Sequence, residues 1–264
     1  MKHAQLSSIF MLTLLAGITI IIGCGASTEQ AADRQAADRQ AERAAEPQVA
    51  QAAISPVRRS ARVSTVELSI RLPKAMFVGT PVPINEPNIA PGRAKGQERP
   101  VIEIPEGSVN LALKKPVMSS ESLPVFGALE MITDGEKCGE DAHVVDVSIG
   151  KRWVQIDLGL RANIHGVSMW HYHAKARAYR DVIVEVADDE DFIENVQIVF
   201  NSDHDNSYGK GIGEEMGYVE TNEGKFIYCP EKTQGRYVRL HSQGNTDSDH
   251  NHYIEVEVYG IPIK

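Results

Sequence analysis

The sequence predicts an all-β protein built around an antiparallel β-sandwich in residues 109–264. Several segments alternate apolar and polar residues, as in "WVQIDLG", where Val154, Ile156 and Leu158 share one face. These segments are short, polar or glycine-rich loops separate them, and no stretch of the sequence keeps a helical period of apolar residues. Such a series is typical of a sandwich or barrel, and about 150 residues are enough for one buried core.

The expected strands follow one another along this C-terminal part of the chain. After "WVQIDLG", a short turn at 161–163 leads to "IHGVSMW". "DVIVEVADD" places its alternating valines on the inner face and then ends at two aspartates. The series continues with "ENVQIVF", "KFIYC" and "RYVRLHS". It closes with "YIEVEVYG", where Ile254, Val256 and Val258 alternate with glutamates and are expected to share the buried face.

The first residues resemble a bacterial export signal with a lipid attachment site. The apolar run from Ile9 to Ile22 is too short to span a bilayer and fits a secretory signal. It ends in "IIGC", which resembles the bacterial lipobox and predicts a lipoprotein signal peptide over 1–23 with Cys24 as the lipidated residue. An ordinary signal peptide with a chance cysteine is the alternative. The expected location is the bacterial cell envelope, lipid-anchored at the outer membrane, cell surface or periplasm.

Between the signal and the sandwich the composition changes twice. Residues 24–63 form a tether rich in alanine, glutamine and arginine, which has no apolar stripe to bury. Residues 64–108 are rich in proline, and the short apolar runs "VELSI" and "MFVG" predict one or two strands there. The sandwich domain is expected to begin at 109.

Charge and motifs exclude several functions. The chain carries a net charge of −9 and no basic stripe, which argues against nucleic-acid binding. It contains no Cys-x-x-Cys, P-loop, Gly-x-Ser-x-Gly or His-Glu-x-x-His motif. Beyond Cys24 there remain Cys138 and Cys229, which in an exported protein either form a disulfide or stay as two separate buried thiols.

Six segments, taken in order, resemble a known family. They are "NLALKKPVMSS", "ITDGE", "WVQIDLG", "VEVADDEDF", "GRYVRLHS" and "EVEVYG". Together they resemble a discoidin, or coagulation factor 5/8 type C, domain from about Asn110 to Gly260. The resemblance implies a galactose-binding-like jelly roll. Such domains bind glycans, or in some members phospholipid headgroups, through loops at one end of the sandwich, and they are not catalytic.

The same resemblance implies a structural Ca²⁺ ion. In glycan-binding members of the family, the ion is held near a "DG" turn and by the first glutamate of the last strand, which here map to Asp134 and Glu255. Carboxylate and carbonyl oxygens suit Ca²⁺, although "DGEKCGED" departs from the family's Asn- and Thr-rich version. The alternative is that Asp134 caps a turn and Glu255 faces solvent or an arginine.

The stretch "WHYHAKARAYRD" is the expected ligand loop. A sugar needs a flat apolar face for its C–H groups and polar groups for its hydroxyls. Tyr179 or Tyr172 would supply the stacking ring here. The expected ligand-binding side chains are Tyr172, His173, Arg177, Tyr179 and Arg180, joined by His143 and Asp247 from neighbouring loops. The alternative for Tyr179 and Arg180 is a packing role at the rim of the sandwich.

The polar run "GNTDSDHNH" raises the question of a transition-metal centre. His250 and His252 lie two residues apart, which places both on one face of an extended chain. Asp247 and Asp249 could add ligands, but the spacing matches no standard zinc motif. Contact with solvent or sugar is the favoured interpretation of these histidines.

The favoured function is that of a non-catalytic, lipid-anchored envelope protein whose discoidin-like module binds extracellular or cell-wall glycans. A structural or protein-interaction module on the same fold, without a sugar site, is the alternative. An enzyme is the third hypothesis and the least favoured one. Glycosidases need two opposed carboxylates on a catalytic scaffold, and this chain has little room for such a scaffold beside the sandwich. The expected partners are glycans or another envelope polymer and, through the anchor, the membrane, but no nucleic acid.

Overall fold

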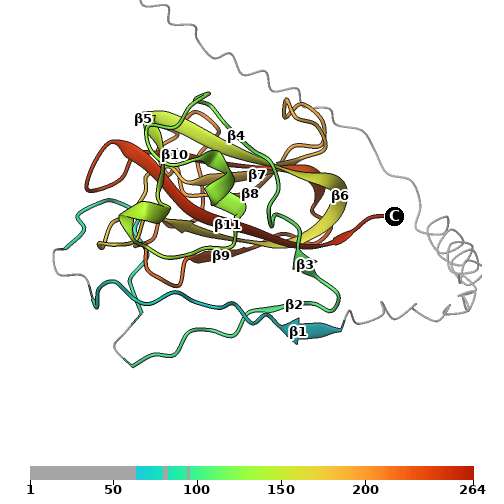
Figure 1. Ribbon diagram of the computed structural model, residues 1–264, viewed down its shortest axis with the longest axis horizontal. Coiled ribbons are helices and arrows are strands. Elements are labelled where there is room, and N and C mark those ends of the chain that lie inside the picture. Colours follow the sequence, from blue (N-terminus) through green and yellow to red (C-terminus); the bar gives the residue numbers. More distant parts are fainter. Residues whose placement is uncertain (1–63, 80–82, 94–95) are drawn as a thin grey trace, which may run out of the picture. The chain divides into compact units, whose positions relative to one another are not determined.

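The computed structural model describes residues 64–79, 83–93 and 96–264 (Figure 1). The predicted signal peptide, Cys24 and the tether lie outside the described residues. Among the described residues, no helix is long and apolar enough to cross a membrane. The elements in chain order are β1 (Thr65–Glu67), β2 (Glu103–Pro105), β3 (Val109–Asn110), β4 (Val117–Ser119), η1 (Leu129–Thr133), η2 (Asp141–His143), β5 (Val145–Ile149), β6 (Lys151–His171), β7 (Ile183–Ala187), β8 (Gln197–Asn201), β9 (Lys225–Tyr228), β10 (Gln234–Gln243) and β11 (His250–Pro262).

The predicted all-β fold class is confirmed. Nine strands form one antiparallel sheet in the order β3-β11-β6-β10-β7-β8, with β4 and β9 paired to β6 and β5 paired to β11. The sheet folds over a single large core, in which Val154, Ile156 and Leu158 are fully buried as their alternation predicts. The valines of β7 lie in the same core.

Strand β6 corrects one expectation. The turn predicted at 161–163 is absent, and β6 runs without interruption for 21 residues. Its first half pairs with β4 and β10, and its second half pairs with β9 and β11, so this one strand joins the two layers. The chain bends near Gly159, which has a φ of +76° and donates its N–H to the Asp157 carboxylate at 2.8 Å.

The last strand, β11, contains a bulge that the alternating pattern did not reveal. Tyr253 pairs with His171 and Glu255 pairs with Trp170, so Ile254 is an extra residue between them. Ile254 therefore packs in a separate cluster with Trp170, whereas Val256 and Val258 enter the main core. The expectation that all three apolar residues share one face is wrong for Ile254.

The proline-rich segment is part of the folded unit. β1 pairs with β2 beside the sandwich, which confirms a strand within "VELSI", whereas "MFVG" forms none. Ile102 and Ile104 pack against Tyr259 of β11, with Leu68 and Ile70 partly buried beside them. The proline-rich segment thus packs on Tyr259 of β11. The described residues before and after 109, where the sandwich was expected to begin, belong to one compact unit.

The two cysteines of the domain are separate thiols, one of the two alternatives that the sequence left open. Cys138 and Cys229 are both free and only partly buried, rather than fully buried as that alternative had it. Cys229 packs against the main core, and burial raises the pKa of its thiol to about 12. Cys138 lies in the loop between η1 and η2.

We expect Ile104→Ala to lower the free energy of unfolding by about 2–5 kcal/mol, because Ile104 is 2% exposed and the truncation leaves a cavity against Tyr259. Val101→Ala is the matched control, since Val101 is 61% exposed and should change stability by less than about 0.5 kcal/mol. Urea unfolding of the full chain measures both. Equal effects of the two substitutions would show that the proline-rich segment does not pack on the sandwich.

Candidate functional site

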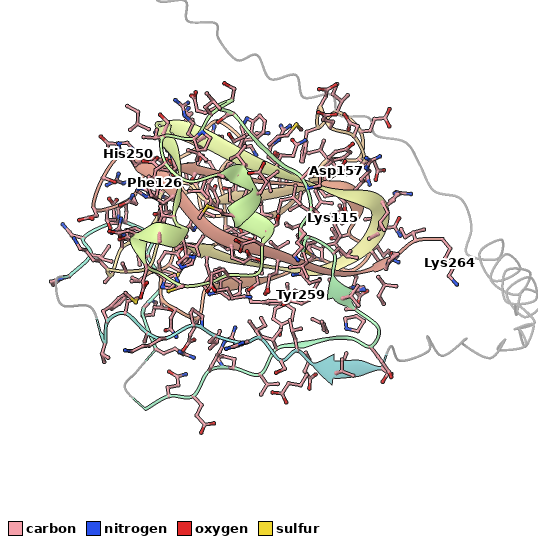
Figure 2. All side chains as sticks on the ribbon, in the orientation of Figure 1. Lys115, Phe126, Asp157, His250, Tyr259 and Lys264 are labelled. Carbon is pink, nitrogen blue, oxygen red and sulfur yellow. The ribbon has the colours of Figure 1, made fainter. Side chains whose placement is uncertain are left out.

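An open hollow at one end of the sandwich is the candidate site. It has a volume of about 280 Å³ and is called the Phe126 pocket below. Figure 2 labels Phe126 and, beside it, His250 at this end of the molecule. The residues that line the pocket are Phe126, Asp141, Val144, Asp146, Tyr172 and His252.

Strand β5 holds the two sides of the Phe126 pocket together. On one side the Asp146 N–H donates to the carbonyl of Phe126 at 2.9 Å, and the Val125 N–H donates back to the carbonyl of Asp146 at 2.7 Å. On the other side Asp146 is paired with His252 of β11. The register therefore brings an exposed ring, a carboxylate and an imidazole into one row across three chain segments.

Tyr172 follows β6 and forms another wall of the pocket. Its hydroxyl donates to the Asp141 carboxylate, and the Arg177 guanidinium lies over its ring, 4.6 Å from the centroid. Arg177 is itself paired with Asp247 at 3.2 Å. Burial, reinforced by Asp141, raises the pKa of Tyr172 to about 12, so the hydroxyl stays protonated at neutral pH. These contacts hold the ring in one orientation.

The two histidines of β11 meet at Asp146, and their predicted placement on one face is confirmed. Their rings are stacked with centroids 5.9 Å apart. His250 Nδ1 shares a hydrogen bond with Asp146 Oδ2 at 2.8 Å, whereas His252 Nδ1 bonds to the Tyr179 hydroxyl at 2.9 Å. Burial lowers the pKa of His252 to about 4, so this imidazole is neutral over most of the physiological range.

The structure corrects the roles expected of Tyr179, His173 and Arg177. Tyr179 is only 3% exposed and stacks on His171 at 4.2 Å, so its ring cannot receive a sugar. His173 and Arg177 are also buried. His173 Nε2 is bonded to the carbonyl of Lys137 at 3.0 Å. Tyr179 and Arg177 support the pocket through His252 and Tyr172, and for Tyr179 the packing role is the correct alternative.

Arg180 lies away from the Phe126 pocket. It forms an ion pair with Glu86 at 2.7 Å and lines a different hollow of about 220 Å³, which Asp181 and His204 also border. Tyr179 separates the two hollows, because its hydroxyl bonds to His252 and its backbone bridges Asn245. The segment expected to carry one site is thus divided between a pocket wall, a buried support and a second surface.

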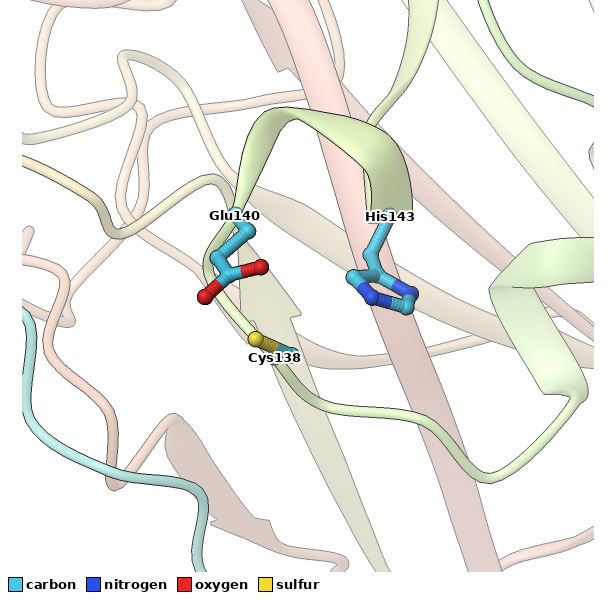
Figure 3. A group of neighbouring side chains, drawn as sticks. All are labelled: Cys138, Glu140 and His143. Atoms are coloured by element: carbon cyan, nitrogen blue, oxygen red, sulfur yellow. The ribbon is translucent and has the colours of Figure 1, made fainter.

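The two expected site residues from neighbouring loops, Asp247 and His143, lie in different positions relative to the pocket. The Asp247 side chain is about half exposed and reaches the pocket indirectly, through its ion pair with Arg177. His143 does not line the Phe126 pocket, and its imidazole turns toward Cys138 and Glu140 (Figure 3). Among the predicted ligand-binding residues, Tyr172 is therefore the one that lines the pocket.

Sequence reasoning missed Phe126, Asp141 and Asp146. Phe126 belongs to "LPVFG", in which Leu123, Val125 and Phe126 are 81%, 62% and 53% exposed. A run of apolar residues between a proline and a glycine, outside every expected strand, was a usable signal for an exposed loop. Asp141 and Asp146 carry no comparable signal, because isolated aspartates are common at loop ends.

The expected calcium residues do not fit Ca²⁺. Asp134 accepts the Glu136 N–H at 2.7 Å, which is the turn-capping alternative. Glu255 is fully buried and accepts the Gly135 N–H at 3.1 Å. Burial raises its pKa to about 9, which leaves this carboxyl protonated at neutral pH. Ca²⁺ takes six to eight oxygen ligands, and one of the two expected carboxylates is already engaged in capping a turn.

A lysine supplies the positive charge in this region instead. Lys137 Nζ donates to the Gly135 carbonyl at 3.3 Å, pairs with Glu257 at 2.7 Å and lies 5.2 Å from the centre of the Trp170 ring. A bound Ca²⁺ would have to lie beside this buried ammonium group and would be repelled by it. No chemical step or structural role is therefore assigned to calcium.

Comparison with known proteins gives structural likeness without a family assignment. No protein-family model matches the chain, and no curated protein matches it significantly. Solved structures that resemble part of it include proteins described as carbohydrate-binding modules.

Three of these structures illustrate the likeness. Truncated AlyQ, with CBM32 and alginate lyase domains, has 14% identity and a TM-score of 0.43 over 60% of this chain, which spans 34% of that protein's length. A mutant of chitosan-binding module 1 from a Paenibacillus sp. IK-5 chitosanase/glucanase has 19% identity and a TM-score of 0.41, covering 57% of this chain and 98% of its own. A fucose-binding module from Streptococcus pneumoniae has 18% identity and a TM-score of 0.40, covering 57% and 97%. At these values no residue role is taken from them.

We expect Lys137→Ala to destabilise the protein by about 3–5 kcal/mol, because it leaves the buried Glu257 carboxylate without a cation and with only the Tyr259 hydroxyl bonded to it. Arg161→Ala is the control, since the Arg161 side chain is 49% exposed and its ion pair with Asp188 should contribute about 1 kcal/mol or less. Thermal unfolding of the full chain measures both variants.

The same unfolding experiment tests calcium in the unsubstituted protein. We expect millimolar Ca²⁺ to leave its melting temperature unchanged, because the Lys137 ammonium group beside the turn would repel the ion. A rise in melting temperature on adding Ca²⁺ would indicate that the folded state binds the ion after all.

Proposed function

We propose that the protein binds a glycan in the Phe126 pocket and acts by binding, without catalysis. The observation that carries the proposal is an exposed aromatic ring, Phe126, beside the carboxylates of Asp141 and Asp146 and the neutral imidazole of His252. A sugar ring can lay its C–H face on the aromatic ring while its hydroxyls donate to the carboxylates. The hollow is open, as a binding site at the end of a polymer or branch requires.

The charge of the Phe126 pocket favours neutral or amino sugars over uronic acids. Asp141 and Asp146 line the pocket, and His252 does not offset them because it is uncharged at neutral pH. Arg177, which lies over the Tyr172 ring, is 3% exposed and already paired with Asp247. A carboxylated sugar would be repelled here, whereas an ammonium group would gain a charge-assisted hydrogen bond.

A protein partner is the second candidate, and a different feature favours it. One loop exposes three apolar side chains within four residues, those of Leu123, Val125 and Phe126. An exposed apolar patch is a common feature of protein interfaces. Phe126 belongs to both surfaces, so the two functions are separated by Tyr172, which lines the pocket and lies outside this apolar loop.

We expect Phe126→Ala and Tyr172→Ala each to weaken glycan binding about tenfold, the equivalent of losing roughly 1–1.5 kcal/mol of stacking. Tyr228→Ala is the matched control, because Tyr228 is a 55% exposed ring on β9 outside the pocket. An array of neutral, amino and acidic glycans identifies the ligand for the full chain, and calorimetric titration with that glycan then compares the folded variants.

Two results would contradict the proposal. Undiminished binding by both pocket variants would place the sugar elsewhere. The interaction-module alternative holds under two conditions. The array shows no bound glycan, and the binding of an isolated protein partner is abolished by Leu123→Ala but retained by Tyr172→Ala.

We also propose that Cys24 anchors the protein by a lipid in the bacterial cell envelope, on the strength of the short apolar run that ends in "IIGC". We expect Cys24→Ser to move the protein from the membrane pellet to the soluble fraction and to remove the mass of the lipid. Cys229→Ser is the control, because this thiol packs against the sandwich core. Unchanged fractionation and mass in Cys24→Ser would rule out the anchor.

A further inference from the structure

Three side chains that bind soft and borderline metals converge on the loop before β5. The thiol of Cys138, the carboxylate of Glu140 and the imidazole of His143 each place one ligand atom within 4.8 Å of the other two (Figure 3). The loop lies next to the Phe126 pocket, which takes Asp141 from it, but none of the three residues lines that pocket.

Hydrogen bonds and ion pairs do not explain why these three groups converge. Within the described part of the chain, neither the thiol nor the two other ligand groups form a hydrogen bond or an ion pair, and Cys138 is in no disulfide. The comparable cluster of Asp146, His250 and His252 differs, because its atoms bond to one another and to Tyr179. Mutual hydrogen bonds account for that second cluster but not for the first.

The backbone of the loop is held in a fixed shape. The N–H groups of Lys137 and Cys138 both donate to the Glu136 carboxylate at 2.9 Å, and the His143 N–H donates to the carbonyl of Glu140 at 3.0 Å. Gly139 lies directly against the ring of buried His173, where a Cβ atom would come within 2.6 Å of two ring atoms. The ligand groups therefore project from a loop whose backbone is held by its own hydrogen bonds and by the packing of Gly139.

The donor set matches zinc. A thiolate, an imidazole and a carboxylate are the side chains that Zn²⁺ takes, at bond lengths of about 2.0–2.3 Å, which set ligand atoms roughly 3.3–3.8 Å apart in a tetrahedron. Separations within 4.8 Å need only a small side-chain movement to reach this geometry. Sulfur and nitrogen donors disfavour Ca²⁺ and Mg²⁺. Glu140 is exposed and the other two residues are half-buried, which leaves a path for the ion.

We propose that Cys138, Glu140 and His143 bind one Zn²⁺ ion, with water as the fourth ligand. The thiol loses its proton on binding, and the thiolate and carboxylate together neutralise the two charges of the ion. Because Asp141 lies between two of the ligands in the chain, the ion would fix the segment that carries this carboxylate into the Phe126 pocket.

Cobalt substitution in the full chain tests the site directly, in the absence of any glycan. Co²⁺ bound through Cys138 gives a thiolate-to-metal charge-transfer absorption, which Zn²⁺ should abolish by displacing it. We expect Cys138→Ser to eliminate this absorption, and His143→Ala and Glu140→Gln each to weaken Co²⁺ binding roughly tenfold or more. Cys24→Ser and Cys229→Ser are matched thiol controls and should keep it.

The second histidine cluster provides the other control. His250→Gln should leave the charge-transfer absorption and its Co²⁺ affinity unchanged, because that cluster contains no thiol. Absence of the absorption in the unsubstituted protein, or its survival in Cys138→Ser, would overturn the zinc site. If circular dichroism shows that Cys138→Ser is unfolded, the other two variants decide. An undiminished absorption in both His143→Ala and Glu140→Gln would then overturn the zinc site. The cobalt absorption involves no sugar, so a negative result does not bear on the proposed glycan pocket. Equally, a failure to bind glycans would not bear on the zinc site.

Discussion

The pairing of β6 with β11 is the contact on which the rest of the structure depends. β6 passes from one layer of the sandwich to the other, and β11 runs along its second half while also holding β3 and β5. Through β5 this pairing sets Asp146 opposite His252, and the bridge from Asp146 to Phe126 follows from it. A shift of one residue between β6 and β11 would turn these side chains to opposite faces. The hydrogen-bond register of the core thus determines the geometry of the pocket.

A layer of buried polar groups lies between that core and the pocket. His171 and Glu220 are fully buried and share a hydrogen bond of 2.6 Å, Tyr179 stacks on His171, and the Tyr179 hydroxyl reaches His252. Burying polar groups costs stability unless they are bonded to one another, so such a layer specifies one arrangement closely. A wall that is already ordered loses little conformational entropy when a ligand binds, which favours affinity from a small open site.

The sequence pattern predicted the fold class because alternation reports which residues are buried, as Val154 and Ile156 show. It could not show how the strands continue. Arg161 looks like part of a turn, yet it stays within β6 because the neighbouring residues 162–163 pair with β10 and β11. The bulge at Ile254 has no signature either, because its cause is the pairing of Tyr253 and Glu255 with the neighbouring strand.

The site was harder to predict, because composition shows which groups are present but not where they point. Tyr172 and Tyr179 are chemically alike and lie seven residues apart, yet one lines the pocket and the other supports it. The calcium resemblance compared carboxylates and overlooked Lys137, which was visible in the sequence. Its ammonium group pairs with Glu257 and bonds to the carbonyl of Gly135. This cation occupies the turn itself, whereas the thiol, carboxylate and imidazole of the loop that follows form no hydrogen bond with it.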